Sequence, residues 1–504
     1  MRRTLFVPLV AALLLSGCGG DGPTEPAGTP GLHVVAGAGV TDTVDAILPA
    51  ELVVELRDQN AKPRAGVAVV FFVSEFNFSG AMVARSGTLD FQLEVVDTTD
   101  ASGRATARVR LGRLAAQKSV SVAVVGEPQT RTEANYTVVP GAAAIIRTSP
   151  RDTAIYATRS YPLSVVVTDR HGNSRPDAVQ FAALTPTLAR VSGTGVVEAL
   201  AVGRARVQVS SGGLAETVSV SIPPQGVFTA TRIAGSGSSF RIRVVSMQLD
   251  GTGETIDIST DFWSDAGFAW SPDGGTLAVA IGDHDADLYR KSTAGVARLV
   301  QSPTTLWSKA FPRYSHDGAW VYFNGRTGGT RTEIWRARAD GTGAERVGPP
   351  AGDYDKDVGP DPSPDGTRVA YSTNRANVTM PVIRILTLAT RTVSAIDAPG
   401  VTPRWTPDGT RVAFVSTGPQ WGYLSDSRAM GSAGSLVLMD PAGANRTTLD
   451  TGSKRWSPHF DFSPDGKYIL ALSNAGLVEL VEVATGTTIP LPFARGLILP
   501  EWKP

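Results

Sequence analysis

The chain of 504 residues has very little cysteine and histidine, and its tryptophans are confined to one part of the sequence. It contains one cysteine and five histidines, and no tryptophan precedes Trp263. A single cysteine excludes any disulfide within the chain. Long stretches with helical spacing of apolar residues are also missing. Short apolar runs are instead broken by Gly, Asp and Pro, a pattern that predicts an all-β protein of two to four domains.

Neither sign of charge is in excess. Lys plus Arg and Asp plus Glu both number 47, so the formal net charge is zero. Without a basic tail or stripe, nucleic acid is not an expected partner. The sequence also lacks a Gly-x-Ser-x-Gly nucleophile motif, an HExxH motif, Cys/His metal spacing and a phosphate-binding loop. We therefore expect a protein that is not an enzyme.

The beginning of the chain predicts export and anchoring to a membrane. Two arginines precede an apolar run from Leu5 to Leu15, which is too short to cross a bilayer as a mature helix. The sequence Leu-Ser-Gly-Cys18 then resembles a bacterial lipobox, which implies a lipoprotein signal peptide at 1–17 and lipidation of Cys18. An ordinary signal peptide with a chance cysteine is the alternative. Residues 18–31 suit a flexible tether. The following Gly19, in place of Asp, resembles enteric signals for the outer membrane.

Residues 32–140 and 141–222 are both expected to form β-sandwiches. The first segment contains alternating runs separated by turn sequences. Its order of LVVELRDQNAKPRAGVAVVFFV and TDASGRATARVRLG resembles bacterial Ig-like domains of the invasin and intimin type. The second segment contains YPLSVVVTDRHGN and VSGTGVVEALAVGRARVQVSS, which resemble the second group of bacterial Ig-like domains. Adhesion and spacing are both open as roles, and we favour spacing because a fold does not define a function.

Residues 223–504 repeat one short phrase five times. The copies are WSPDGGTLAVA from Trp270, YSHDGAWVYFN from Tyr314, PSPDGTRVAYS from Pro362, WTPDGTRVAFV from Trp405 and FSPDGKYILAL from Phe462. Their aspartates are 44, 48, 43 and 57 residues apart, a period typical of β-propellers. Pro fixes φ in the turn, Asp bonds the backbone two residues on, and Gly takes the left-handed position. The aspartates are therefore expected to form turns.

A sixth blade is expected to be split between the two ends of this segment. Residues 499–504, LPEWKP, resemble the start of another unit, while residues 228–258 supply three strands without a first strand. Their pairing predicts a six-bladed ring without free sheet edges. The x-[ST]-[PH]-D-G phrases resemble those of the periplasmic TolB propeller and its relatives. This likeness implies the fold and leaves the function open.

The two faces of such a propeller are expected to carry different loops. The regular SPDG turns lie on one face, and the longer irregular connections lie on the other, where functional residues are usually found. An insertion at 418–435 belongs to the irregular face, and its aromatic residues suit sugars or peptide backbones. Packing of the tryptophans between blades is the alternative. The binding candidates are Trp263, Trp307, Trp421, Tyr423, Trp456 and His284.

Two acidic runs on the irregular face are calcium candidates, because calcium prefers several carboxylate oxygens. Neither run completes an EF-hand, since the sixth position is Leu288 or Val358 instead of Gly and the twelfth is not Glu. A solvated acidic loop is the alternative, and no other cofactor is expected. The candidate ligands are Asp283, Asp285, Asp287, Asp353, Asp355 and Asp357.

These patterns together predict a lipid-anchored protein of the bacterial cell envelope, placed at the outer membrane. Two Ig-like modules would hold out a propeller that binds an envelope protein partner without catalysis. The alternative is a carbohydrate-binding protein or polysaccharide lyase that uses the irregular face. For that alternative His284, which has an aspartate on either side, is the residue to examine first.

Overall fold

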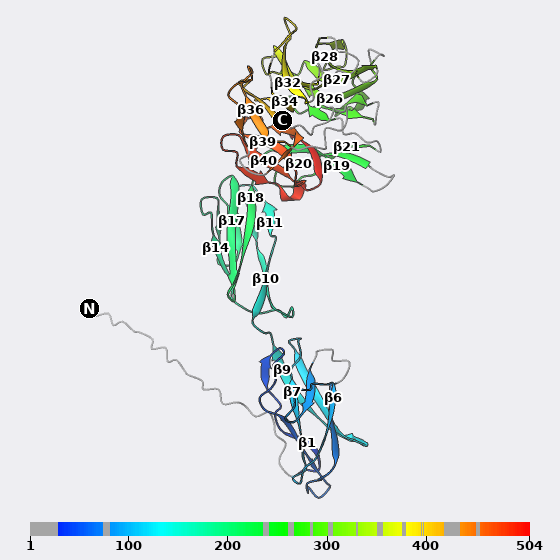
Figure 1. Ribbon diagram of the computed structural model, residues 1–504, viewed down its shortest axis with the longest axis vertical. Coiled ribbons are helices and arrows are strands. Elements are labelled where there is room, and N and C mark those ends of the chain that lie inside the picture. Colours follow the sequence, from blue (N-terminus) through cyan, green and yellow to red (C-terminus); the bar gives the residue numbers. More distant parts are fainter. Residues whose placement is uncertain are drawn as a thin grey trace, which may run out of the picture. The chain divides into compact units, whose positions relative to one another are not determined.

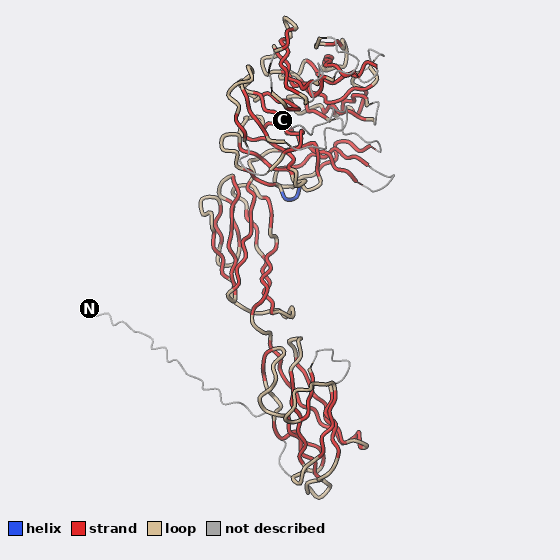
Figure 2. Tube along the Cα trace, in the orientation of Figure 1, coloured by secondary structure: helices blue, strands red, loops and turns tan. Residues whose placement is uncertain are grey.

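The computed structural model is almost entirely β-structure (Figures 1 and 2). The one helical element among the described residues is a 3-10 turn, η2 (Pro492–Ala494). No helix in this part of the chain has the length and apolar character needed to cross a bilayer. The expected all-β class is therefore confirmed. The structure describes residues 29–73, 81–234, 241–260, 267–282, 286–300, 306–328, 331–349, 356–374, 380–394, 396, 398–417, 434–449 and 454–504.

The first domain is a β-sandwich with one core. Its strands are β1 (Gly31–Ala36), β2 (Thr41–Thr43), β3 (Leu52–Arg57), β4 (Ala68–Phe72), β5 (Met82–Arg85), β6 (Glu94–Thr98), β7 (Arg104–Arg110), β8 (Gln117–Val124) and β9 (Glu127–Val139). One sheet has the order β1-β3-β7-β5, and the other β2-β9-β8-β4-β6. Alternate residues such as Leu52, Val54 and Phe71 are fully buried, because every second side chain of a strand faces the core.

The second domain is built from shorter strands. They are β10 (Ala143–Ser149), β11 (Asp152–Ala154), β12 (Ser160–Pro162), β13 (Ser164–Asp169), β14 (Gln180–Ala183), β15 (Ala189–Val191), β16 (Val196–Ala199), β17 (Gly203–Ser211) and β18 (Leu214–Ile222). The sheets have the orders β10-β13, β11-β18-β17-β14 and β12-β16-β15. The longest strands, β17 and β18, alternate in burial and contribute Val207, Val209 and Val220 to the core.

The described part of residues 227–503 forms six four-stranded antiparallel sheets, the blades of a propeller. The strands that face its axis are β22 (Phe268–Trp270), β26 (Ser308–Tyr314), β30 (Asp357–Pro362), β34 (Gly400–Trp405), β38 (Trp456–Phe462) and β42 (Leu497–Lys503). The remaining strands are β19 (Val227–Ala234), β20 (Arg241–Gln248), β21 (Thr255–Thr260), β23 (Leu277–Ile281), β24 (Asp287–Ser292), β25 (Gly295–Arg298), β27 (Trp320–Gly328), β28 (Arg331–Arg338), β29 (Glu345–Arg346), β31 (Arg368–Thr373), β32 (Val382–Thr387), β33 (Thr392–Val393), β35 (Val412–Ser416), β36 (Leu436–Met439), β37 (Thr447–Thr448), β39 (Tyr468–Ser473), β40 (Val478–Glu482) and β41 (Thr488–Pro490).

The ring is closed by the C-terminal strand. Five blades consist of four consecutive strands each, whereas the sixth has the order β21-β20-β19-β42. Strand β42 pairs antiparallel with β19, from Val227 opposite Lys503 to Arg232 opposite Leu497. In Figure 1 the red C-terminal strand accordingly lies beside the green strands β19 and β20. This closure leaves no unpaired inner strand among the six sheets.

The repeated turn is held by the same hydrogen bonds in all five copies. The Ser or Thr hydroxyl donates to Oδ1 of the turn aspartate over 2.5–2.7 Å. The same oxygen accepts the backbone N–H two residues further on over 3.0–3.1 Å. The glycine of each copy has φ between 67° and 70°, a conformation that L side chains rarely adopt. These aspartates are thus occupied by their own turns.

The inner strands carry a second recurring feature, a residue with positive φ. The φ values lie between 49° and 84° at Gly267, Phe311, Gly359, Thr402 and Leu499. At most of these places the pairing with the second strand shifts its register. In four blades the next residue is proline, which has no N–H to contribute to a sheet. Positive φ at non-glycine residues costs about 1–3 kcal/mol each and gathers at functional sites.

Candidate functional site

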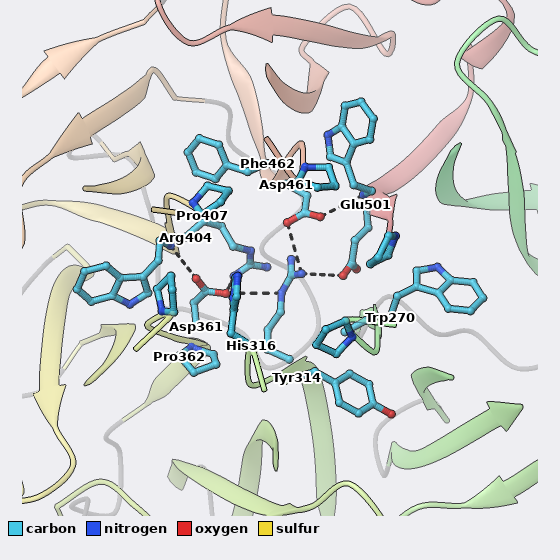
Figure 3. Close-up of a pocket in the computed structure, with 18 of the residues that line it drawn as sticks. Trp270, Tyr314, His316, Asp361, Pro362, Arg404, Pro407, Asp461, Phe462 and Glu501 are labelled. Atoms are coloured by element: carbon cyan, nitrogen blue, oxygen red, sulfur yellow. Dashed lines mark hydrogen bonds and ion pairs between the residues drawn. The ribbon is translucent and has the colours of Figure 1, made fainter. Parts of the chain in front are cut away.

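A cavity lies on the propeller axis at the face that carries the SPDG turns (Figure 3). Its volume is about 250 Å³, and all six blades contribute to its lining. Each blade supplies the residue that follows Ser, Thr or Lys in its turn phrase. These rim residues are Pro272, His316, Pro364, Pro407, Pro464 and Pro504.

Inside the rim lies a set of side chains that we call the axial ring. In five blades its member is the residue four positions before the turn aspartate, and in the sixth blade it is the corresponding residue of β42. Five of the six members are charged, although they project from apolar strands into a largely buried space. The axial ring consists of Ala269, Arg313, Asp361, Arg404, Asp461 and Glu501.

Arg313 forms ion pairs with all three acids of the axial ring. Its Nη1 lies 2.7 Å from Oε1 of Glu501 and 3.5 Å from Oδ1 of Asp461, and its Nε lies 4.0 Å from Oδ1 of Asp361. Figure 3 shows Asp361, Asp461 and Glu501 around the centre of the cavity, with dashed lines that mark their interactions. Burial lowers the pKa of Arg313, but attraction by the three carboxylates outweighs burial, so its pKa lies above the usual value.

The acids differ in their other partners. Oδ2 of Asp361 accepts the N–H of Trp405 at 2.7 Å, and Oδ2 of Asp461 accepts the N–H of Trp502 at 3.1 Å, so each carboxylate is bonded to the next blade. Among the described residues, the bond from Arg313 is the one hydrogen bond of the Glu501 carboxyl. Burial raises the pKa of Asp361 and raises that of Glu501 to about 8. Burial thus favours the protonated form of Glu501, whereas the charge of Arg313 favours the carboxylate.

Arg404 is far less completely paired than Arg313. Its Nη1 donates to the carbonyl oxygen of the adjacent Pro403 at 3.1 Å and lies 4.0 Å from Oδ1 of Asp361. Its Nε is buried and has no hydrogen-bond partner within the described chain. The residue as a whole is 9% exposed. Burial and the neighbouring charge of Arg313 lower the pKa of Arg404 to about 10, which leaves the guanidinium charged at neutral pH.

A smaller cavity of about 30 Å³ lies on the other side of the axial ring. Phe311 and His459 line it together with Arg313, Arg404 and Glu501. The two rings stack with centroids 6.1 Å apart and an angle of 8° between their planes. Burial, followed by the charges of Arg404 and Arg313, lowers the pKa of His459 to about 3. His459 is therefore a neutral imidazole at physiological pH.

Two of the binding candidates expected on the irregular face, Trp307 and Trp456, lie among the described residues. Trp307 lies directly before β26 and is 63% exposed. Trp456 is fully buried in the core shared by two neighbouring blades, so it cannot present a surface to a partner, and the binding interpretation of this residue is wrong. Its ring is needed there to fill the space between sheets. The candidates Trp263, Trp421, Tyr423 and His284, and the lipidation residue Cys18, lie outside the described residues.

The two described calcium candidates are engaged by the fold. The Asp287 carboxylate accepts from Lys309 at 2.9 Å and pairs with Arg298, and Asp357 is fully buried. No group of three His, Cys, Asp or Glu side chains suited to a metal occurs in the described parts of the chain. A calcium ion bound through Asp287 would have to displace both cations. The other candidates, Asp283, Asp285, Asp353 and Asp355, lie outside the described residues.

Sequence reasoning missed the axial ring, although aligning the repeat copies would have revealed it. The position four residues before each turn aspartate reads Ala, Arg, Asp, Arg and Asp, while the flanking positions are mostly aromatic or proline. A charge inside an apolar strand is unfavourable unless it is paired. Such charges at one repeat position predict that they meet one another at the axis.

Comparisons with known proteins agree with the fold. Residues 142–221 match the model of the bacterial Ig-like domain (group 2), the family expected for that segment. An uncharacterized protein of Agrobacterium fabrum is 32% identical over 184 residues, which cover 33% of this chain and 60% of that protein's length. The crystal structure of TolB from Acinetobacter baumannii is 16% identical over 65% of this chain and 83% of its own, with a TM-score of 0.44. The structure of putative TolB from Agrobacterium tumefaciens is 16% identical in sequence, with a TM-score of 0.40. The match covers 53% of this chain and 89% of that structure's chain. The structural neighbours thus include TolB-like propellers.

Proposed function

We propose that this chain is a cell-envelope protein, lipid-anchored through Cys18, whose propeller binds a segment of a partner protein in the axial cavity. The observation that carries the proposal is the cavity itself, to which every blade contributes the same strand position. Its volume of about 250 Å³ is below the range of roughly 300–1,000 Å³ that is usual for small-molecule sites. It therefore suits one or two side chains of an inserted segment.

The lining supports recognition of a peptide. The rim consists of five prolines and one histidine, a rigid and largely apolar surface around a polar centre. Interfaces of this kind, with apolar contacts around a few fixed polar groups, concentrate binding energy in buried anchor residues. Trp270, Trp405 and Trp502 also line the cavity and supply aromatic surface. A segment that inserts an anchor side chain along the axis would contact several blades at once.

A role in binding without catalysis is supported by how the acids are held. Asp361 and Asp461 are fixed by Arg313 and by backbone N–H groups. Groups held in this way keep one orientation, which suits the recognition of a charged ligand. In this proposal the Ig-like domains act as spacers between the lipid anchor and the propeller.

A polysaccharide lyase is the second candidate, and one observation favours it. The neutral imidazole of His459 lies beside the same small cavity as the cationic Arg404. Proton abstraction next to a uronate carboxylate requires a neutral base and a cation that binds the carboxylate. Incubation of the purified chain with polyuronates tests this candidate, because elimination creates an unsaturated product that absorbs in the ultraviolet. No such product from a broad polysaccharide set would eliminate the lyase.

The proposed function is tested by photo-crosslinking in cells at three positions. A photoreactive amino acid replaces His316 on the rim, Trp307 on the irregular face, or Val296, which is 57% exposed on the outer strand β25. We expect one protein to be captured from His316 and not from Val296. Capture from Trp307 alone would instead place the partner on the irregular face. Capture from no position, or equally from all three, would contradict axial binding.

A further inference from the structure

We infer that the occupant of the axial cavity presents a carboxylate, from a Glu or Asp side chain of the inserted peptide, to the guanidinium of Arg404. This inference rests on the proposed function, because it names the chemistry of the segment that the cavity receives. It follows from the hydrogen bonds within the axial ring, in which Arg404 is left incompletely paired.

Arg404 uses few of its hydrogen-bond donors. A guanidinium has five N–H donors in a planar fork. Within the described chain one of them is used, in the bond to the carbonyl oxygen of Pro403, and Nε is buried without a partner. Buried donors are normally paired, so the unpaired Nε shows that the fold does not fully satisfy this guanidinium.

The other members of the axial ring cannot supply the missing partner of Arg404. Asp361 is the nearest acid, but its Oδ1 is shared with Arg313 at 4.0 Å and its Oδ2 accepts the N–H of Trp405. Asp461 and Glu501 are paired with Arg313. Rotation of any of these acids toward Arg404 would break an existing bond.

The sign of the ligand charge follows from the groups of the axial ring that are incompletely paired. Two ring members are incompletely paired, Arg404 and Glu501. A carboxyl can relieve its burial by taking up a proton, and the pKa of Glu501 is raised to about 8 accordingly. A guanidinium has no such route, because it keeps its proton at any physiological pH. Arg404 therefore remains a charged group without a full set of partners, and an anion would supply them.

A carboxylate is the anion that suits this position best. A planar carboxylate matches the guanidinium fork with two parallel hydrogen bonds. A phosphate dianion would bring a second negative charge near Asp361 and Asp461, where like charges repel strongly in a buried setting. A peptide side chain also fills the cavity better than a free small acid, because its backbone can cover the proline rim. The geometry thus favours one acidic anchor residue.

The test uses the full chain and two matched sets of short peptides. The sets are identical except that a central Glu in one is Gln in the other, the flanking positions are random apolar residues, and the C-termini are amidated. Each set is bound to wild type, to Arg404→Met and to Arg411→Met. Arg411 lies in the same blade, outside the cavity, and bonds the backbone and Thr447. The best peptide is then titrated in both forms.

We expect the Glu form to bind wild type and Arg411→Met about tenfold to a hundredfold more tightly than the Gln form, the usual effect of a hydrogen bond between charged groups. In Arg404→Met this preference should fall below about threefold. Equal binding of Glu and Gln forms to wild type would overturn the carboxylate inference and leave the proposed function standing. Binding of neither form would count against peptide binding itself.

Two further arms keep the result decisive. Should Arg404→Met fail to fold, the wild-type comparison of Glu with Gln peptides still decides, and Arg404→Lys should retain a reduced preference because it keeps the charge and loses the fork. The last arm offers oligogalacturonate, whose carboxylates come from a sugar. Binding of this oligosaccharide at Arg404 in place of the peptides would overturn the peptide source.

Discussion

Glu501 and Asp365 are two acidic side chains of the same propeller whose environments shift their pKa values in opposite directions. Glu501 is buried at the axis with one hydrogen bond, and burial raises its pKa from 4.5 to about 8. Asp365 lies in an exposed turn, where hydrogen bonds lower its pKa from 3.8 to about 2. The two residues therefore give stability opposite dependences on pH.

The first prediction concerns Glu501. Between about pH 4.5 and pH 8 the folded state holds a proton that the unfolded state releases. Stability should therefore fall as pH rises through this window, by at most about 1.4 kcal/mol per pH unit. We expect Glu501→Gln to remove this slope, because glutamine does not titrate. The change in the free energy of unfolding is measured by urea unfolding at pH 5 and at pH 8. Tryptophan fluorescence reports on the propeller in this experiment, since all nine tryptophans lie at or after Trp263.

The control for this prediction is Glu254→Gln. Glu254 pairs with Arg232 at the surface of the same propeller and is 38% exposed at its side chain. This variant should keep the wild-type slope between pH 5 and pH 8. A slope that persists unchanged in Glu501→Gln would show that another group is responsible.

The second prediction concerns the turn aspartate Asp365. Its Oδ1 accepts from Ser363 Oγ at 2.6 Å, from the N–H of Thr367 at 3.0 Å and from Thr367 Oγ1 at 2.8 Å. Removal of this acceptor in Asp365→Ala should lower the free energy of unfolding at pH 7 by about 1–2 kcal/mol. The folded pKa is depressed, so this stabilisation is complete above about pH 3.8 and is lost as pH falls through about 2.

Denaturant unfolding of Asp365→Ala and Asp365→Asn checks this argument. The asparagine variant keeps one acceptor oxygen and should lose less stability than the alanine variant. The difference between wild type and Asp365→Ala should shrink as the pH approaches 2. If wild type and Asp365→Ala differed in free energy of unfolding by the same amount at pH 7 and near pH 2, the charge of the Asp365 carboxylate would not contribute to stability.

At the scale of elements, the closing strand β42 is the part on which the propeller depends most. Trp502 on β42 is 6% exposed and belongs to the core between β42, β19 and the last blade. Its ring packs so closely on Gly226 that a Cβ there would lie 2.6 Å from it. Trp502→Ala should therefore lower the free energy of unfolding by about 3–5 kcal/mol, the range for deletion of a large buried ring.

Trp307→Ala is the matched control for this third prediction. It removes the same side chain from a position that is 63% exposed, so its effect should stay within about 0.5 kcal/mol. Thermal unfolding followed by the remaining tryptophans compares the two variants. Similar losses in both would mean that closure by β42 does not stabilise the ring.

The same element shows which features the sequence could predict. The five turn phrases and the C-terminal LPEWKP mark the inner strand of each blade, because turn chemistry is local. The axial ring is not local: Arg313 and Glu501 form a hydrogen bond across 188 positions of sequence. Its charges can be read only by aligning the repeat copies, whereas the positive φ of Phe311, Thr402 and Leu499 has no signal in the sequence, since these residue types rarely adopt it. Loop irregularity indicates one face as a candidate for binding, whereas the proposed axial cavity lies at the face of the SPDG turns.

At the scale of the whole molecule, composition separates the parts. Every tryptophan lies at or after Trp263, and the match to the bacterial Ig-like domain (group 2) covers residues 142–221. The core of the first β-sandwich contains mainly aliphatic residues together with Phe71 and Tyr136, whereas the propeller cores also contain tryptophans. A blade tapers toward the axis, and large rings fill the wider spaces between neighbouring sheets.

The last prediction concerns the attachment of this molecule to a membrane. Cys18 is the only cysteine, so a thioether-linked lipid has one available position. Two or more acyl chains hold a protein on a membrane far more firmly than one, since each buried CH₂ contributes about 0.8 kcal/mol. In cells grown with a labelled fatty acid, we expect wild type to carry the label and to enter the detergent phase of a detergent–water partition. Cys18→Ser should lose the label and move to the aqueous phase, while Thr24→Ser in the tether should behave as wild type. Retention of Cys18→Ser in the detergent phase would refute anchoring through this residue. Attachment to the envelope would then depend on the bound partner protein.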